Sequence, residues 1–110
     1  TSFFGPRGRR QHEGIDIAVP QGTPVRAAER GRVIYAGVLG SYGNVVVLRH
    51  GDRYETVYAH HRRNRVAARS VVERGAVIGE VGATGNATGP HLHFEIRRDD
   101  RPRDPLLYLP

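Results

Sequence analysis

The sequence predicts an all-β domain whose sheets form a sandwich or a barrel. Three observations indicate this fold class. Runs of β-branched and aromatic residues are short and recur along the chain, 7 Pro and 14 Gly divide it into short segments, and no segment has a sustained helical period of apolar residues. Several short strands separated by turn residues are typical of sandwiches and barrels. The 110 residues suit one domain with a modest core, so we expect a single domain over 1–110.

The clearest strands lie in the first half of the chain. Residues 31–36 are rich in β-branched and aromatic side chains and begin at a glycine. Residues 44–50 form an apolar run that ends at the turn pair Gly51–Asp52, and residues 54–60 alternate directly after it. These last two runs therefore predict a β-hairpin.

The second half of the chain adds two more strands. Residues 76–82 and 91–97 have strand composition, whereas residues 66–74 fit either a short helix or an irregular strand. Residues 98–105 are polar and contain two prolines, which indicates a loop. The apolar residues 106–109 are expected to pack back on the body of the domain.

Composition limits the possible functions. There is no Cys, so a disulfide framework and a thiolate metal site are both excluded, and any metal must be held by His, Asp or Glu. All 17 basic residues are Arg and the formal net charge is +6, which favours an anionic partner such as an acidic cell-wall polymer. Aromatic residues are few and no basic helix is evident, so we do not expect nucleic-acid binding.

Membrane insertion and chain ends give further expectations. No apolar stretch approaches the roughly 20 residues that a bilayer-spanning helix needs, so we expect no membrane span. The chain begins with Thr1 rather than Met, which suggests a piece of a longer or processed protein.

A pair of histidines lies in the last expected strand, at positions 91 and 93. Side chains two residues apart in a strand point to the same face, so His91 and His93 share a face with Glu95, and the apolar residues between them face the core. Two imidazoles placed in this way lie about 6 to 7 Å apart along the strand. Both can reach one metal-centred site, one as a ligand and one through a metal-bound water. Glu95 fits equally a hydrogen bond to a ligand histidine and an exposed ion pair with an arginine.

Another pair of candidate ligands lies near the N-terminus. His12 and Asp16 are four residues apart, so an extended segment puts them on one face, and Gly14 permits a bend that brings them closer. Ile15 and Ile17 alternate with Asp16, as in a strand whose carboxylate faces away from the core. Two histidines and a carboxylate with an open fourth position are the pattern of a catalytic zinc site. By contrast, His50 and His61 are expected to be surface or satisfied core residues.

Several blocks of the sequence resemble, in order, the LytM/lysostaphin-type zinc metallopeptidases. They cover nearly the whole chain and comprise His12–Ala18, Gly22–Val25, Gly31–Val33, Tyr42–Asn44, Tyr58–His60 and Gly85–Glu95. The resemblance implies antiparallel sheets in an arrangement like a barrel-sandwich hybrid, with long loops that form a groove. It departs from the family where Leu usually follows the middle histidine, since this chain has His61.

The resemblance also implies a site and a function. One Zn²⁺ would be held by His12, Asp16 and His93, with His91 as the general base and His60 as a second catalytic histidine. The substrate would be a peptide bond in the stem peptides or cross-links of bacterial peptidoglycan, and the location would be the cell envelope, periplasmic or secreted. All five positions carry the residue that an active enzyme needs.

Three other functions fit the sequence less well. The main alternative is a non-catalytic module that binds peptidoglycan or activates cell-wall amidases. A lipoyl- or biotinyl-carrier domain needs an attachment lysine, and this chain has none. A non-haem iron oxygenase with two histidines and one carboxylate is disfavoured by the Leu92–Glu95 context.

Overall fold

The computed structural model is an antiparallel β-structure, and the all-β prediction is confirmed. It describes residues 6–7, 10–51, 54–85 and 89–98, with side chains described from residue 14 onward. Within this part of the chain the only helical segment is one 3₁₀ turn, η1 (Gly40–Tyr42). The strands are β1 (Pro6–Arg7), β2 (Arg10–Ala18), β3 (Pro24–Arg26), β4 (Gly31–Val38), β5 (Asn44–His50), β6 (Tyr54–Asn64), β7 (Val71–Val72), β8 (Val77–Val81) and β9 (His91–Arg98).

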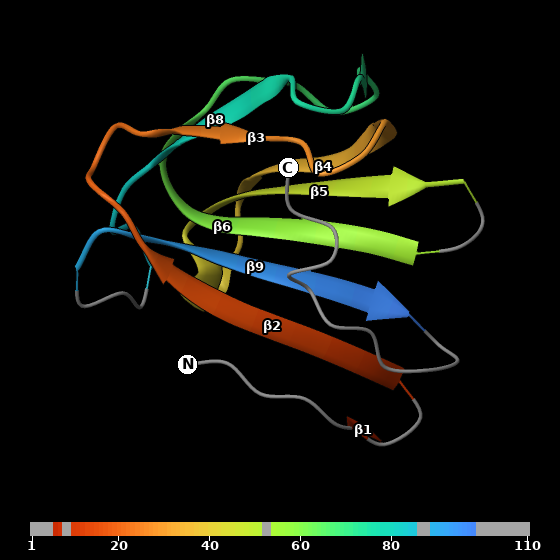
Figure 1. Ribbon diagram of the computed structural model, residues 1–110, viewed down its shortest axis with the longest axis horizontal. Coiled ribbons are helices and arrows are strands. Elements are labelled where there is room, and N and C mark those ends of the chain that lie inside the picture. Colours follow the sequence, from red (N-terminus) through yellow and green to blue (C-terminus); the bar gives the residue numbers. More distant parts are fainter. Residues whose placement is uncertain (1–5, 8–9, 52–53, 86–88, 99–110) are drawn as a thin grey trace.

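Hydrogen bonds join these strands into one continuous, strongly curved sheet. The order along its main path is β1-β2-β9-β6-β5-β4-β7, and β8 branches from β6 to pair with β3. Figure 1 shows β2, β9, β6 and β5 running side by side, with β3 and β8 at the other end of the molecule. The N-terminal strand β2 therefore lies next to the C-terminal strand β9, which brings two distant parts of the sequence together.

The main core lies on one face of the central strands, and a smaller cluster of Val45, Val47, Val57 and Ala59 is buried on the other face of β5 and β6. Phe94 and Ile96 of β9 are almost fully buried, Leu92 packs against them, and Tyr58 of β6 meets Phe94 at a ring-centroid distance of 5.3 Å. Burial of such side chains contributes roughly 1.5 to 3 kcal/mol each. The alternation of β9 predicted this core face correctly, so His91, His93 and Glu95 occupy the opposite face.

The strand predictions agree with most of the observed sheet. The hairpin of β5 and β6 is confirmed, although β6 continues four residues past the predicted end. Residues 66–74 hold the two-residue strand β7 and no helix, so the irregular-strand alternative is correct. Strands as short as β3 and β7 lack enough residues to show alternation in sequence. The predictions for residues 99–109 lie outside the described residues.

Two turns, one at Gly43 and one at Gly85, are in backbone contact with each other beside β6. Gly43 and Gly85 have φ angles of 68° and 75°, which side-chain-bearing residues rarely adopt. A Cβ atom on Gly43 would lie 2.5 Å from the carbonyl carbon of Thr84, and one on Gly85 would meet the backbone nitrogen of Gly43. Only glycine allows this backbone-to-backbone contact. Thr84 then hydrogen bonds through its hydroxyl to the His61 carbonyl at 2.6 Å.

The contact between the two turns gives a prediction about stability. Gly43→Ala should destabilise the fold by about 2 kcal/mol or more beyond Gly75→Ala, because the Gly43 backbone (φ 68°, ψ −138°) suits glycine almost exclusively and the new methyl group overlaps the Thr84 backbone. Gly75→Ala is the matched control, since Gly75 has a φ of 85° but nothing within 4 Å of its Cβ position. Urea denaturation of both variants measures the difference. Equal losses for the two variants would show that the turns do not need close contact.

Candidate metal centre

The register of β2 and β9 brings the acidic candidate ligand to the histidine pair. Asp16 lies directly opposite His93, and Ala18 lies opposite His91. Residues directly opposite in an antiparallel pair point to the same face. The Asp16 Oδ1 atom is accordingly 2.6 Å from His93 Nδ1 and 3.7 Å from His91 Nε2. Two predicted site histidines therefore lie within 4 Å of one Asp16 oxygen, although the side chains that the structure describes form no group of three His, Asp or Glu that could by itself hold a metal ion.

The glycine between His12 and Asp16 has a different role from the one expected. The strand β2 pairs with β9 in unbroken register through Gly14, so there is no bend. A Cβ atom on Gly14 would lie 3.1 Å from Glu95 Cγ and 3.2 Å from His93 Cε1. Gly14 thus leaves space for the His93 ring to lie across the strand. The backbone of His12 pairs with Arg97 in the same ladder, and its side chain lies outside what the structure describes.

His60 reaches the same place from β6 through an irregular backbone. The register between β5 and β6 shifts just before His61, and His60 has a φ of 66°. Such strained geometry in a residue with a side chain costs of order 1 to 3 kcal/mol and tends to occur at functional sites. It turns the His60 ring towards β9, where its centroid lies 4.8 Å from that of His91 and 6.0 Å from that of His93.

Backbone carbonyls fix the proton positions on two of these rings. His60 Nδ1 is 2.7 Å from the Thr84 carbonyl oxygen, and His91 Nδ1 is 2.9 Å from the Gly89 carbonyl oxygen. A carbonyl only accepts, so both Nδ1 atoms donate, and a neutral ring then keeps a bare Nε2. Burial lowers the pKa of His60, and the nearby His91 and His93 lower it further against the opposing Thr84 hydrogen bond. The His60 ring is therefore neutral at pH 7, with Nε2 as a proton acceptor.

His93 lies between two carboxylates. Its Nδ1 atom is the one near Asp16, and its Nε2 atom is 2.7 Å from Glu95 Oε2. Burial by itself raises the pKa of Glu95, but hydrogen bonds from His93 and Tyr42 together with the charges of His93 and Arg97 outweigh it and lower the pKa to about 2. Glu95 is thus ionised and hydrogen bonds to the ligand candidate His93, as the first alternative expected, whereas its ion pair with Arg97 is buried rather than exposed as the second alternative had it.

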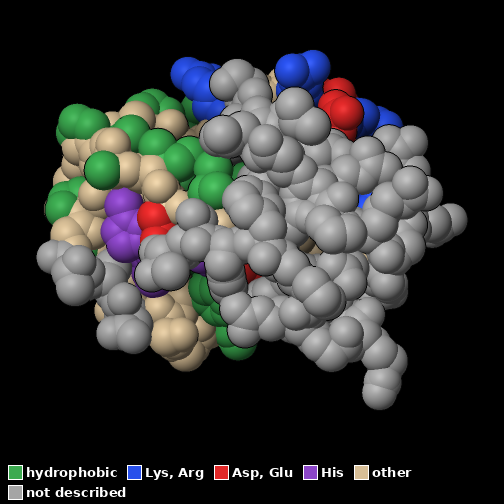
Figure 2. Space-filling model, turned by 60° about the horizontal axis from the view of Figure 1, so that its bottom comes forward, with side chains coloured by type: hydrophobic (Ala, Val, Ile, Leu, Met, Phe, Trp, Pro, Cys, Tyr) green, Lys and Arg blue, Asp and Glu red, His purple; other side chains and the backbone are tan. Residues whose placement is uncertain are grey.

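Sequence reasoning missed three residues around the site. Tyr42, Arg97 and Thr84 each contact a candidate residue or its partner. Arg97 lies two residues after Glu95 in the same strand, so strand alternation puts it on the face of His93 and Glu95 and could have identified it. Tyr42 and Thr84 lie in turns, where spacing gives no direction. Figure 2 shows that histidine side chains reach the molecular surface beside an acidic side chain.

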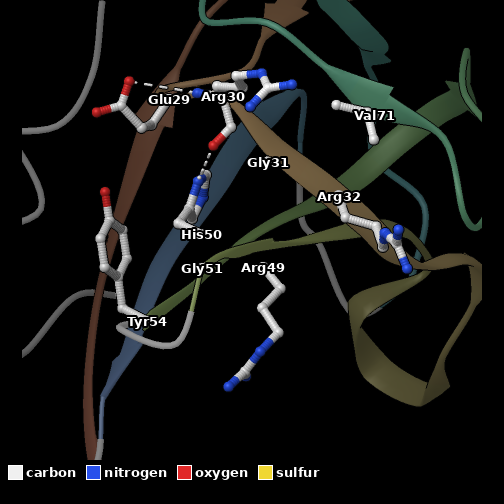
Figure 3. Close-up of a pocket in the computed structure, with 9 residues that line it drawn as sticks. All are labelled: Glu29, Arg30, Gly31, Arg32, Arg49, His50, Gly51, Tyr54 and Val71. Carbon is white, nitrogen blue, oxygen red and sulfur yellow. Dashed lines mark hydrogen bonds between the residues drawn. The ribbon is translucent and has the colours of Figure 1, made fainter.

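A separate hollow of about 650 Å³ is lined by none of His60, His91 and His93. Figure 3 shows its lining, which comprises Glu29, Arg30, Gly31, Arg32, Arg49, His50, Gly51, Tyr54 and Val71. Two of its arginines are ion-paired, Arg30 with Glu73 and Arg49 with Glu55. His50 has both ring nitrogens bonded, at 2.7 Å each, to the Arg30 carbonyl and the Thr56 hydroxyl. His50 is thus a satisfied core histidine, as expected. The hollow has no second histidine beside it, unlike the site that contains His60, His91 and His93.

The chain belongs to peptidase family M23, whose profile it matches over residues 10–105. The resemblance to LytM/lysostaphin-type peptidases is therefore confirmed. The match includes every candidate site residue named above.

Two curated relatives cover most of this chain. The DD-carboxypeptidase/endopeptidase Mpg of Neisseria meningitidis is 50% identical over 88% of this chain and 22% of its own length. The lipoprotein NlpD/LppB homolog of Pseudomonas aeruginosa is 47% identical over 90% of this chain and 33% of its own length. The chain thus spans about a fifth to a third of these relatives.

Two solved structures have the same fold. The catalytic domain of lysostaphin from Staphylococcus simulans is 31% identical, with a TM-score of 0.79 over 96% of this chain and 86% of that one. A zinc-containing peptidase from Vibrio cholerae is 41% identical, with a TM-score of 0.79 over 84% of this chain and 29% of that one. The described residues contain no helix long and apolar enough to cross a membrane.

His61, the residue that departs from the family pattern, is neither exposed nor fully satisfied. Its side chain is completely buried, Nδ1 is 2.8 Å from Asn64 Oδ1, and Nε2 has no hydrogen-bond partner. Burial lowers its pKa, against the opposing Asn64 hydrogen bond. The expectation of a surface or satisfied core histidine is therefore wrong for His61.

The depressed pKa of His61 predicts how stability depends on pH. As the pH falls below about 6.5, the unfolded chain binds a proton at this histidine while the folded chain does not, so the folded state loses stability. His61→Leu should remove this loss, because leucine binds no proton, while at pH 7.5 the gain from deleting the unpartnered nitrogen is offset by loss of the hydrogen bond to Asn64. Urea denaturation at pH 7.5 and pH 5.5 measures both effects. The stability of the variant relative to the wild type should rise at the lower pH, and a constant difference would contradict the account.

Proposed function

We propose that this domain is a zinc-dependent endopeptidase that hydrolyses peptide bonds in peptidoglycan stem peptides or cross-links. The observation that supports it most is the convergence of Asp16 and His93 with two further histidines whose Nε2 atoms are proton acceptors. Membership of a peptidase family and the names of the relatives support the same reaction class.

The donor set suits zinc. Imidazole nitrogen and carboxylate oxygen are ordinary zinc ligands, and three protein ligands are typical of a catalytic site. Asp16 Oδ1 and His93 Nδ1 face each other, so a cation between them would replace a shared proton. His12, four residues before Asp16 in the same strand, is the proposed third ligand. The solved zinc-containing peptidase from Vibrio cholerae agrees with this choice of metal.

His91 is the proposed general base. When bound, zinc supplies Lewis acidity, which polarises a carbonyl and lowers the pKa of a bound water towards about 7. The His91 Nδ1–H group donates to the Gly89 carbonyl, so Nε2 has the lone pair that accepts the proton of the attacking water. The same nitrogen then returns the proton to the leaving amine.

The geometry revises the role of His60. As a second catalytic histidine, His60 would be expected to donate a hydrogen bond to the oxyanion of the tetrahedral intermediate. Because its Nδ1–H group is already held by the Thr84 carbonyl, the neutral ring has no second proton to donate. We therefore assign to His60 Nε2 an accepting role, in which it orients the attacking water or a substrate N–H group. His60 can donate only after it has itself taken up a proton.

The names of the relatives and the charge of the chain support the proposed substrate and location. The Neisseria relative is named as a carboxypeptidase and endopeptidase, and the Pseudomonas relative is named as a lipoprotein. A net charge of +6 suits an acidic wall polymer. We propose that the domain acts in the bacterial cell envelope, periplasmic or secreted, as part of a longer protein.

Removal of a ligand should abolish metal binding and activity together. Asp16→Ala and His93→Ala should each lose the bound zinc, because two remaining donors hold zinc poorly, and each should lose hydrolysis of purified peptidoglycan. Metal analysis after dialysis gives the zinc stoichiometry, and circular dichroism checks that the zinc-free variants fold. An Asp16→Ala variant that retained one zinc per chain would refute the assignment.

Removal of the proposed general base should lower hydrolysis without loss of the bound zinc. His91→Ala should keep its zinc but lower kcat on purified peptidoglycan by about a hundredfold or more, the usual size of a general-base effect. The measurement is release of soluble fragments at saturating substrate, with zinc content determined on the same sample. Full turnover by this variant would exclude His91 from the role.

The alternative of a non-catalytic module can be distinguished from the enzyme. In that case, the wild-type domain loaded with zinc would sediment with peptidoglycan but would release no fragments. The complete set of five candidate residues favours the enzyme.

A further inference from the structure

Tyr42, Glu95 and Arg97 form a closed polar cluster behind His93. Glu95 Oε2 accepts from His93 Nε2 at 2.7 Å and from the Tyr42 hydroxyl at 2.8 Å. Arg97 Nε donates to Glu95 Oε1 at 3.2 Å, and Arg97 Nη2 donates to the Tyr42 hydroxyl oxygen at 2.9 Å. Each of the three residues contacts the other two, so the carboxylate is held from both of its oxygens.

The cluster is built into the fold rather than formed by mobile surface groups. Glu95 is only 5% exposed, although a lone carboxylate is costly to bury. Its strand is central in the sheet, between β2 and β6, and Tyr42 comes from η1, the turn that precedes β5. The Tyr42 ring also lies 6.0 Å from the His93 ring and carries the Arg97 guanidinium at 5.8 Å from its centroid. Two separate elements thus converge on one side of His93.

The position of the cluster determines which nitrogen of His93 is available. A neutral imidazole has one proton, and a metal ligand nitrogen must have none. Glu95 is an acceptor fixed at Nε2, so the proton of a metal-binding His93 belongs there, and Nδ1 is the bare nitrogen. Nδ1 is also the atom that faces Asp16. The two contacts fix the same ring orientation, but Asp16 alone would favour a proton on Nδ1. Glu95 is therefore the group that favours the Nε2–H tautomer, which leaves Nδ1 bare once a cation replaces the proton between Nδ1 and Asp16.

We propose that Glu95 is a positioning residue that holds His93 in the tautomer and orientation needed to bind the metal through Nδ1, and that Tyr42 and Arg97 hold Glu95 in place. The proposal rests on the zinc site proposed above. Carboxylates that accept from a metal-bound histidine typically change metal affinity 10- to 100-fold when mutated. Glu95 touches neither substrate nor metal in this proposal and acts through His93.

A purely structural role for Glu95 predicts a different pattern. If the carboxylate only neutralised Arg97 inside the sheet, its loss would change the thermal stability of the zinc-free protein and leave zinc affinity unchanged. Glu55 provides a matched control for that case. Glu55 lies on β6, opposite Arg97 of β9, and is half-buried. It forms an ion pair with Arg49 at 2.9 Å and is not one of the residues that hydrogen bond to His93.

The test compares Glu95→Gln, Tyr42→Phe, the double variant and the Glu55→Gln control in the whole domain. For each, competition with a chromogenic chelator gives the Kd for zinc, and the Tm of the zinc-free protein reports stability. Glu95→Gln should weaken zinc binding by about 10- to 100-fold, and Tyr42→Phe should weaken it by a smaller factor. Because Tyr42 acts through Glu95, the double variant should match Glu95→Gln rather than show the product of the two losses. Glu55→Gln should bind zinc as the wild type does.

Each outcome is decisive. If Glu95→Gln and Tyr42→Phe bind zinc within about twofold of the wild type, whatever their Tm, the positioning role is wrong. If Glu95→Gln does not fold, Tyr42→Phe alone decides, since it keeps the ring and removes only the hydroxyl. Failure of the wild-type domain to bind zinc would overturn the proposed function and this inference with it. Zinc binding and hydrolysis by the wild type with unaffected variants would overturn the inference alone.

Discussion

The antiparallel register between β2 and β9 is the constraint on which the site depends. It brings Asp16 to His93, 77 residues later in the sequence, with their nearest polar atoms 2.6 Å apart. A slip of one residue would move every side chain of β2 to the other face. The register is secured from the opposite face, where Ile15 lies opposite Phe94 in the core. The same pairing of β2 with β9 thus buries apolar residues on one face of the sheet and brings the site residues together on the other.

The other half of the site depends on strain that the fold absorbs elsewhere. His60 keeps a left-handed backbone conformation, and the Thr84 carbonyl holds its ring. Thr84 is itself held where the glycine turns of Gly43 and Gly85 meet backbone to backbone. Residues that look like ordinary turn formers in the sequence therefore control where a histidine side chain points.

The sequence predicted the fold class, the hairpin of β5 and β6, and the core face of β9, because alternation is a local property. Alternation also placed His91, His93 and Glu95 on one face. It could not show that Asp16 lies opposite His93, since strand pairing at long range leaves no local signal, and family resemblance supplied that link. Nor could it show the strained backbone of His60, the role of Gly14 as space for a ring, or the unpartnered nitrogen of His61. Each of these depends on a neighbour from another strand.

The proposed function requires that a divalent metal bind between two strands, β2 and β9, that come together only on folding. Anomalous X-ray diffraction from crystals of the zinc-loaded domain, measured on both sides of the zinc absorption edge, tests this most directly. The account predicts one zinc-specific peak per chain, in contact with Asp16 Oδ1 and His93 Nδ1. A peak bound elsewhere, or no peak in crystals grown with equimolar zinc, would contradict it.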